Sequence, residues 1–161
     1  MEIDLLRVPK ASRQVIFWIH PEGRVVGSIF LRKHSAYHAG SETPLEALNH
    51  PEPFIVFKRE NPQELRFYNR KSVIRVEYDG KDYHVATAIK PLPCQMHMMD
   101  GSFIKGTIHE PLHPNKARLL DYLNKSEDAF INVQVDENTI LVNKSYINYV
   151  HIDNLEDSDD V

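Results

Sequence analysis

The sequence predicts a mainly β protein with short helices, made of two tandem five-stranded small barrels, each with a helix between strands two and three. Three observations support this prediction. Short apolar or alternating runs are separated by turn residues, which is typical of strands. Glycines lie inside some of these runs, and four blocks of sequence recur in the same order. Closure into small barrels would remove the exposed edges of such short strands.

The recurring blocks indicate an internal repeat. The clearest block reads PLEALN at residues 44–49 and LLDYLN at residues 119–124, so that Leu45 and Leu120 are 75 positions apart. The other paired blocks are residues 15–31 and 94–108, 53–58 and 129–134, and 69–76 and 143–150. We therefore expect a first barrel unit at 1–90 and a second at 91–152. The remaining residues, 153–161, carry five acids and are predicted to be a disordered acidic tail.

Each repeat is predicted to begin with a β-hairpin. Asp100-Gly101 is a strong turn signal in the second unit, and Pro21-Glu22-Gly23 takes its place in the first. Glycine is suited to these turns because it adopts positive φ without steric cost. Gly27 and Gly106 follow within the second strand of each hairpin. A glycine in a strand marks a bend or a close approach of two backbones.

A short helix is expected after each hairpin. Residues 43–46 (Thr-Pro-Leu-Glu) form a capping-box pattern with proline at the first helical position. In the second unit the helix is predicted at Ala117–Asn124, with Asn115 as its cap. A buried strand is predicted next, starting at Phe54 in the first unit and Phe130 in the second.

This arrangement resembles the Sm-like family of small β-barrels. The hairpin MMDGSFIKGTI (98–108) matches the family's polar turn and following glycine, and NKSYINYVHI (143–152) matches its closing segment. The chain differs from the family in two places. Asn69-Arg70-Lys71 and Asn143-Lys144-Ser145 stand where the family's second motif has its glycine. The predicted helix follows the second strand, whereas in the family it precedes the first. The chain is therefore closer to an uncharacterised bacterial family of tandem repeats than to the RNA-binding members. Ring assembly of the Sm kind would join three chains into a pseudo-sixfold ring.

Composition narrows the classes of function. The 161 residues contain no apolar run of about 18, which argues against a membrane span. The N-terminus does not have the pattern of a secretory signal, and Cys94 is the one cysteine, so a cytoplasmic location is expected. A net charge of −4 argues against a mainly electrostatic nucleic-acid binder.

Charge is nevertheless distributed unevenly along the chain. Residues 58–81 contain seven cations and four acids, a net charge of +3, whereas residues 121–161 contain ten acids and two lysines, a net charge of −8. A basic barrel face with aromatic residues could stack single-stranded bases, so RNA or single-stranded DNA is an alternative partner. The candidate binding residues are Arg66, Asn69, Arg70, Lys71, Arg75, Asn143 and Lys144.

A cyclic dinucleotide is a further alternative ligand. Arg66 and Arg70 form an R-x-x-x-R string, and a D-G-S segment beginning at Asp100 follows later. The pair resembles the phosphate-gripping arginines and the second motif of PilZ domains, although Gly106 lies one position further along than in that motif.

Catalytic and metal-binding patterns are weak in this sequence. The histidine pairs His34/His38 and His109/His113 have the spacing of zinc ligands on a helix, but no convincing third ligand accompanies them. Cys94 is predicted to be a buried, inert thiol. We therefore expect a non-enzymatic module without a cofactor, a metal or an obligatory small molecule, which binds another protein or a second copy of itself.

Overall fold

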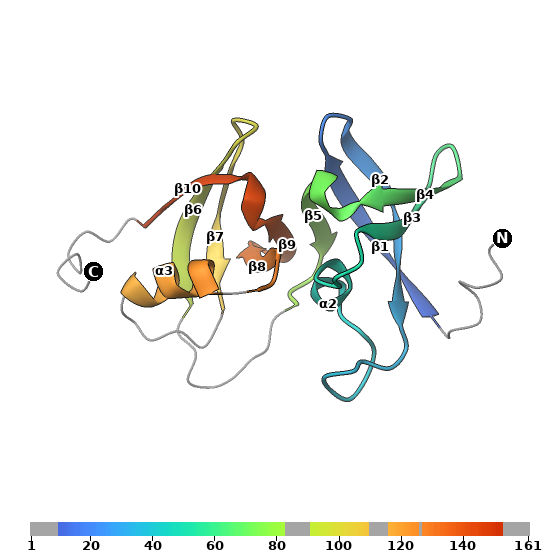
Figure 1. Cartoon of the computed structure of the whole chain (residues 1–161), viewed down its shortest axis with the longest axis horizontal. Helices are drawn as coiled ribbons and strands as arrows, with labels where there is room; N and C mark the ends of the chain where they lie inside the picture. The colour runs from blue at the N-terminus through green and yellow to red at the C-terminus, as the bar shows by residue number, and fades with distance from the viewer. Residues whose placement is uncertain (1–9, 83–90, 110–115, 126, 153–161) are drawn as a thin grey trace. The chain divides into compact units, whose positions relative to one another are not determined.

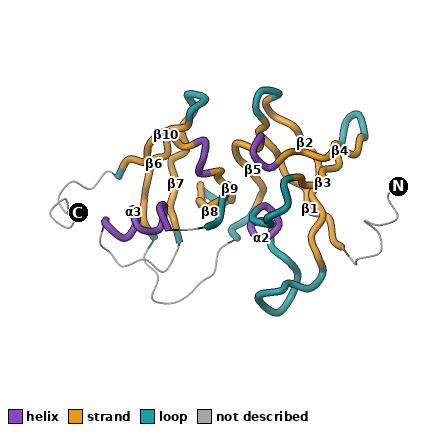
Figure 2. The backbone as a smooth tube through the Cα atoms, viewed as in Figure 1, coloured by secondary structure: helices purple, strands orange, loops and turns teal. Residues whose placement is uncertain are grey.

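The computed structural model describes residues 10–82, 91–109, 116–125 and 127–152. The chain divides into two compact units, Met1–Tyr78 and Asp79–Val161. Strands make up most of the described backbone in both units (Figure 2), which confirms the mainly β class. The predicted boundary at residues 90/91 adjoins residues 83–90, which lie outside the described part of the chain, as does the predicted acidic tail.

The first unit has five antiparallel strands in the order β5-β1-β2-β3-β4 (Figure 1). Its elements are β1 (Lys10–Ile19), β2 (Gly23–Arg32), α2 (Pro44–Leu48), β3 (Phe54–Arg59), β4 (Glu64–Asn69), the 3₁₀ turn η1 (Arg70–Ser72) and β5 (Val73–Asp79). The helix therefore follows the second strand, as predicted, and a tight 3₁₀ turn joins the last two strands.

The second unit repeats this succession of elements. Its strands lie in the order β10-β6-β7-β8-β9 and the ladders between them are antiparallel (Figure 1). Its elements are β6 (Leu92–Met98), β7 (Phe103–Ile108), α3 (Lys116–Lys125), β8 (Phe130–Val135), β9 (Asn138–Asn143), the 3₁₀ turn η2 (Lys144–Tyr146) and β10 (Ile147–His151). Within each unit, the last strand therefore pairs with the first.

Closure of each unit into a five-stranded barrel is not confirmed. Among the described residues, the strand order of each unit is open, with no ladder joining β4 to β5 or β9 to β10. Each unit nevertheless buries an apolar core. In the first unit the Phe17 and Phe57 rings pack with centroids 4.5 Å apart, and Leu48 of α2 is fully buried. Met96 and Val133 are equally buried in the second unit.

The glycines have the conformations and positions expected from the sequence. Gly23 and Gly101, in the two hairpin turns, have φ of +96° and +89°. A Cβ atom at Gly27 would overlap the carbonyl oxygen of Lys58, and one at Gly106 would overlap the carbonyl oxygen of Gln134. The second strand of each unit therefore approaches the third so closely that only glycine fits.

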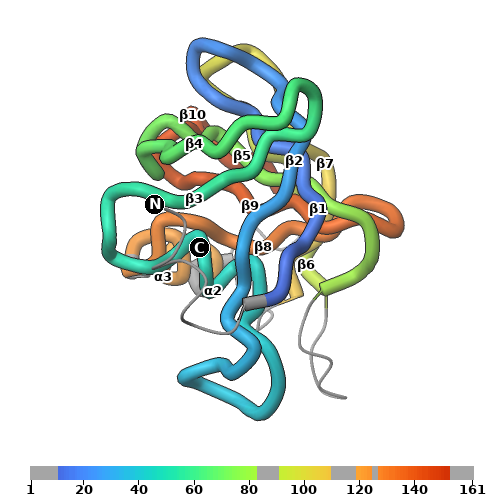
Figure 3. Tube along the Cα trace, turned by 90° about the vertical axis from the view of Figure 1, so that its right-hand side faces the viewer, coloured from blue at the N-terminus to red at the C-terminus, as the bar shows by residue number. Residues whose placement is uncertain are grey.

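The helix of the first unit begins as its capping signal predicts. The Thr43 hydroxyl accepts a hydrogen bond from the Glu46 amide at 3.2 Å. The Glu46 carboxylate accepts from the Ser35 hydroxyl and lies against His38, and so ties α2 to the loop that precedes it. Figure 3 shows this loop, residues 33–43, extending from the end of β2. In the second unit the helix is confirmed, but its predicted cap Asn115 lies outside the described residues.

Neither helix in the described part of the chain has the length and hydrophobicity that a membrane crossing requires.

Candidate binding surfaces

An apolar surface lies on the outward side of the β3–β4 hairpin. Three cross-strand pairs form this surface, which we call the β3–β4 face: Phe54 with Asn69, Val56 with Phe67, and Lys58 with Leu65. Phe54, Leu65 and Phe67 are 54%, 44% and 63% exposed. The prediction that Phe54 starts a buried strand is therefore wrong, because the alternation of β3 buries Ile55 and Phe57 instead.

The corresponding positions of the second unit are mostly buried. There Phe130 pairs with Asn143, Asn132 with Leu141, and Gln134 with Thr139, and Phe130 and Leu141 are 1% and 0% exposed.

Hydrogen bonds connect the end of the β8–β9 hairpin to the segment that follows β5. The Thr139 hydroxyl donates to the Gly80 carbonyl at 2.8 Å and accepts from the Asp82 amide at 3.0 Å. The Gln134 amide donates to the side chains of Thr139 and Asn132. Residues 80–82 therefore lie against β8 and β9.

Arg66 belongs to a cluster of charged and phenolic side chains. Its guanidinium donates to Glu64 Oε1 at 2.6 Å and Glu22 Oε2 at 2.8 Å, and the Tyr68 hydroxyl donates to Glu22 Oε1 at 2.8 Å. The hydrogen bond to Glu64, followed by those to Glu22 and Tyr68, raises the pKa of Arg66. The cluster connects β4 to the β1–β2 turn.

The pKa of Glu22 should make the stability of the first unit sensitive to acid. Burial raises this pKa, but hydrogen bonds from Arg66 and Tyr68 outweigh burial and place it below the ordinary glutamate value of 4.5. A carboxyl whose folded-state pKa is depressed stabilises the fold above its unfolded pKa, and this contribution is lost as pH falls through the folded value. We expect Glu22→Gln to melt below wild type at pH 6 and this deficit to be smaller at pH 3, measured by thermal melts. An equal deficit at both pH values would contradict the assignment.

Arg70 and Lys144 hold equivalent structural positions in the two units. Arg70 donates from Nη1 to the carbonyls of Glu52 and Phe54 and from Nη2 to the carbonyl of Ala47 in α2, at 3.0 Å. Lys144 Nζ donates to the carbonyl of Leu123 in α3 at 3.3 Å. Each cation lies at the last turn of the unit's helix, where a positive charge interacts favourably with the helix dipole. Burial lowers the pKa of both side chains.

Asn69 and Asn143 cap the 3₁₀ turns that follow β4 and β9. Asn69 Oδ1 accepts from the Lys71 amide at 2.9 Å, and Asn143 Oδ1 accepts from the Ser145 amide at 3.0 Å. The Lys71 side chain is exposed. These asparagines have a clear structural role, while their role in binding stays a prediction.

Arg75 completes the set of predicted binding residues. Its guanidinium lies 4.4 Å from the centroid of the Trp18 ring, and its Nε donates to Glu77 at 3.1 Å. Arg66, Arg70 and Arg75 thus all have intramolecular partners, and the basic character of residues 58–81 is partly neutralised locally. Lys58 and Lys71 remain exposed cations of this region.

The structure holds the residues of the predicted cyclic-dinucleotide motif in separate local networks. Arg66 binds carboxylates, whereas Arg70 binds backbone carbonyls. Asp100 Oδ1 accepts from the amide and the hydroxyl of Ser102 and stabilises the hairpin turn of the second unit. Cyclic-dinucleotide binding stays a prediction, which a thermal shift with the ligand and with Arg66→Ala would test.

The structure describes three of the four paired histidines and the cysteine. His34 and His38 lie in a loop, not on a helix, and His113 is outside the described residues. In the described part of the chain, no group of three or more metal-ligating side chains is present. Cys94 is buried, as predicted, and burial raises the pKa of its thiol to about 11.

Two features of the second unit were not found from the sequence. The rings of Tyr149, His97 and Phe103 stack across β10, β6 and β7, with centroid distances of 4.2 Å and 5.8 Å. A pocket lies nearby along the strands and includes Lys81, Thr107 and Gln134. Neither feature has a local sequence signal, because its members come from separate strands. Comparison of the chain with known proteins finds no matching family model, no matching curated protein and no matching solved structure.

Proposed function

We propose that the chain is a non-enzymatic assembly module that binds a second copy of itself through the β3–β4 face of its first unit. The observation that supports this proposal is the exposure of Phe54 and Phe67 on one face of a hairpin whose outer strand, β4, ends the strand order of its unit. Clustered exposed aromatic residues favour association, and an edge strand supplies unpaired backbone groups.

Charge favours a second copy of the chain as the partner. Lys58 lies on the β3–β4 face and Lys71 lies in the turn after β4, whereas residues 121–161 carry a net charge of −8. The second unit of one copy would thus be electrostatically complementary to the first unit of another. The shared strand order of the two units supports the further proposal that each is a copy of one Sm-like unit, in which case three chains would close a ring.

Sedimentation velocity and light scattering over a range of concentrations test this function. We expect an oligomer for the wild-type chain. Full burial of an exposed aromatic side chain contributes about 1.5–3 kcal/mol, and Phe54 and Phe67 are 54% and 63% exposed, so Phe54→Ser/Phe67→Ser should weaken association by about tenfold or more.

Tyr37→Ser is the matched control, since Tyr37 is also an exposed aromatic residue of the first unit but lies in the loop after β2, outside the β3–β4 face. It should leave association unchanged. A wild-type chain that is monomeric up to about 1 mM would contradict the proposal. Binding of a single-stranded oligonucleotide that weakens steeply with salt and is lost in the double variant would assign the face to nucleic acid instead.

A further inference from the structure

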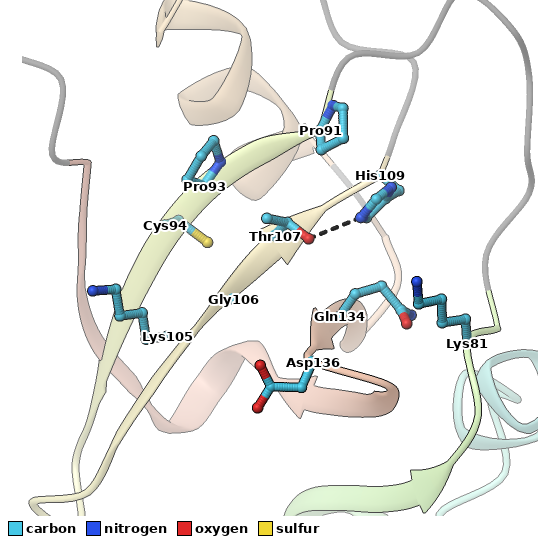
Figure 4. Close-up of a pocket in the computed structure, with 10 residues that line it drawn as sticks. All are labelled: Lys81, Pro91, Pro93, Cys94, Lys105, Gly106, Thr107, His109, Gln134 and Asp136. Atoms are coloured by element: carbon cyan, nitrogen blue, oxygen red, sulfur yellow. Dashed lines mark hydrogen bonds between the residues drawn. The ribbon is translucent and has the colours of Figure 1, made fainter.

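A pocket of about 510 Å³ lies within the second unit (Figure 4). Its walls come from β6, β7 and β8, together with Lys81 and the residue after β7, His109. This volume is within the range of small-molecule sites. The pocket belongs to none of the surfaces used for the proposed assembly.

One end of the pocket carries hydrogen-bonding and positively charged groups. Figure 4 shows Lys81, His109 and Gln134 toward one end and Pro93 and Lys105 toward the other. Thr107 Oγ1 lies 2.8 Å from His109 Nε2. Lys81 Nζ is 3.6 Å from Glu137 Oε1, but both side chains are largely exposed, so this ion pair is weak and leaves the lysine able to bind a ligand.

The lining of the pocket contains two lysines, Lys81 and Lys105, and one carboxylate, Asp136. Burial, and then the charge of Lys81, lower the pKa of His109, so that the imidazole is neutral and the lysine supplies the charge. The Asp136 carboxylate, which also lines the pocket, points away from Lys81 in Figure 4. An anion placed between Lys81 and Thr107 would meet the ammonium group, and the Thr107 hydroxyl can donate to it when His109 Nε2–H donates to Thr107 Oγ1.

Apart from Lys105 and Asp136, the rest of the lining suits an apolar group. Pro91, Pro93 and Cys94 form the β6 side, and Gly106 adds no side chain. Small-molecule sites commonly combine such apolar walls with a few polar groups that fix orientation.

The first unit differs at the matching positions. There Gln14, Ser28 and Lys58 are paired across three strands, in the same register as Pro93, Thr107 and Gln134 in the second unit. Gln14 Nε2 donates to Glu60 Oε1 at 2.6 Å and so bridges β1 to the end of β3. The second unit has Pro93 at the position of Gln14. Proline has no side-chain amide and cannot make this hydrogen bond, so the space above β7 stays open.

We propose that this pocket binds a small organic anion, with its carboxylate or phosphate group between Lys81 and Thr107 and its apolar body against Pro91 and Pro93. The two anionic groups share this chemistry, and a set of simple probes separates them. Benzoate and phenyl phosphate carry both parts, benzyl alcohol lacks the charge, and inorganic phosphate lacks the apolar body.

Titration of the labelled full-length chain by NMR tests the proposal. We expect benzoate or phenyl phosphate to shift the His109 ring and Thr107 amide signals saturably at millimolar concentration, with the stronger probe identifying the anionic group. Lys81→Met should weaken this binding at least tenfold, whereas Lys33→Met, at an exposed lysine in the loop after β2 of the first unit, should not.

Three results of the wild-type titrations would overturn the proposal. They are equal binding of benzyl alcohol, equal binding of inorganic phosphate, and the absence of any saturable shift up to about 10 mM of either aromatic anion. Unchanged affinity in a folded Lys81→Met variant would also overturn it, and His109→Gln provides a second variant should Lys81→Met fail to fold.

Discussion

Gly27→Ala is expected to destabilise the first unit by about 3 kcal/mol or more, because the new methyl group would occupy the space of a backbone atom. A Cβ at this position overlaps the Lys58 carbonyl oxygen and the Phe57 ring. The ring is itself fully buried against Phe17, so it has little room to move. Relief therefore requires β2 and β3 to separate, which breaks their ladder.

Trp18 is the single tryptophan of the chain and lies in β1, so its fluorescence during urea unfolding reports on the first unit. Gly23→Ala is the matched control: Gly23 has φ of +96° but open space around it. That variant should lose only about 1–2 kcal/mol, the cost of a left-handed conformation. Equal unfolding midpoints for the two variants would show that β2 and β3 are not in close contact at Gly27.

Arg70→Ala is expected to lower the stability of the first unit by about 3 kcal/mol, since charge-assisted hydrogen bonds to three carbonyls would be lost at once. Those carbonyls belong to Ala47, Glu52 and Phe54, so one side chain joins the end of α2 to the start of β3. For a unit of this size, such a loss corresponds to a fall in melting temperature of roughly 10–20 °C.

Lys71→Ala provides the comparison. Lys71 is the next residue after Arg70 and its side chain is exposed, so this substitution should change stability by less than about 0.5 kcal/mol. Arg70→Lys should recover part of the loss, as Lys144 makes the equivalent bond to α3 in the second unit. An Arg70→Ala variant as stable as wild type would contradict the structural role. Loss of ligand binding in Arg70→Ala would therefore need a folding control.

Local chemistry allowed the main elements to be predicted from the sequence. The Thr43 cap depends on contacts only three residues apart, and the turn at Gly101 needs only a residue that tolerates positive φ. A glycine within a strand commonly marks a bend or a close approach of two backbones. Gly27 and Gly106 could therefore be predicted as such positions. Such signals act over a few residues and are therefore readable in the sequence.

Exposure and long-range contacts could not be predicted in this way. Phe54 and Phe130 are the same residue type at matching positions, yet one is exposed and the other buried, because exposure depends on what packs above the strand. Arg70 was interpreted as a ligand-binding residue, and its carbonyl partners lie 16 to 23 positions away. The pocket lining similarly combines residues from separate strands.

Hydrogen–deuterium exchange at low and high protein concentration tests most directly whether the β3–β4 face is where two copies meet. Self-association should slow exchange of the β4 amides, residues 64–69, and leave the β6–β7 turn at residues 99–102 unchanged. The concentration dependence should disappear in Phe54→Ser/Phe67→Ser. Association that protects other segments while β4 exchanges at the same rate at every concentration would contradict the assignment of this face.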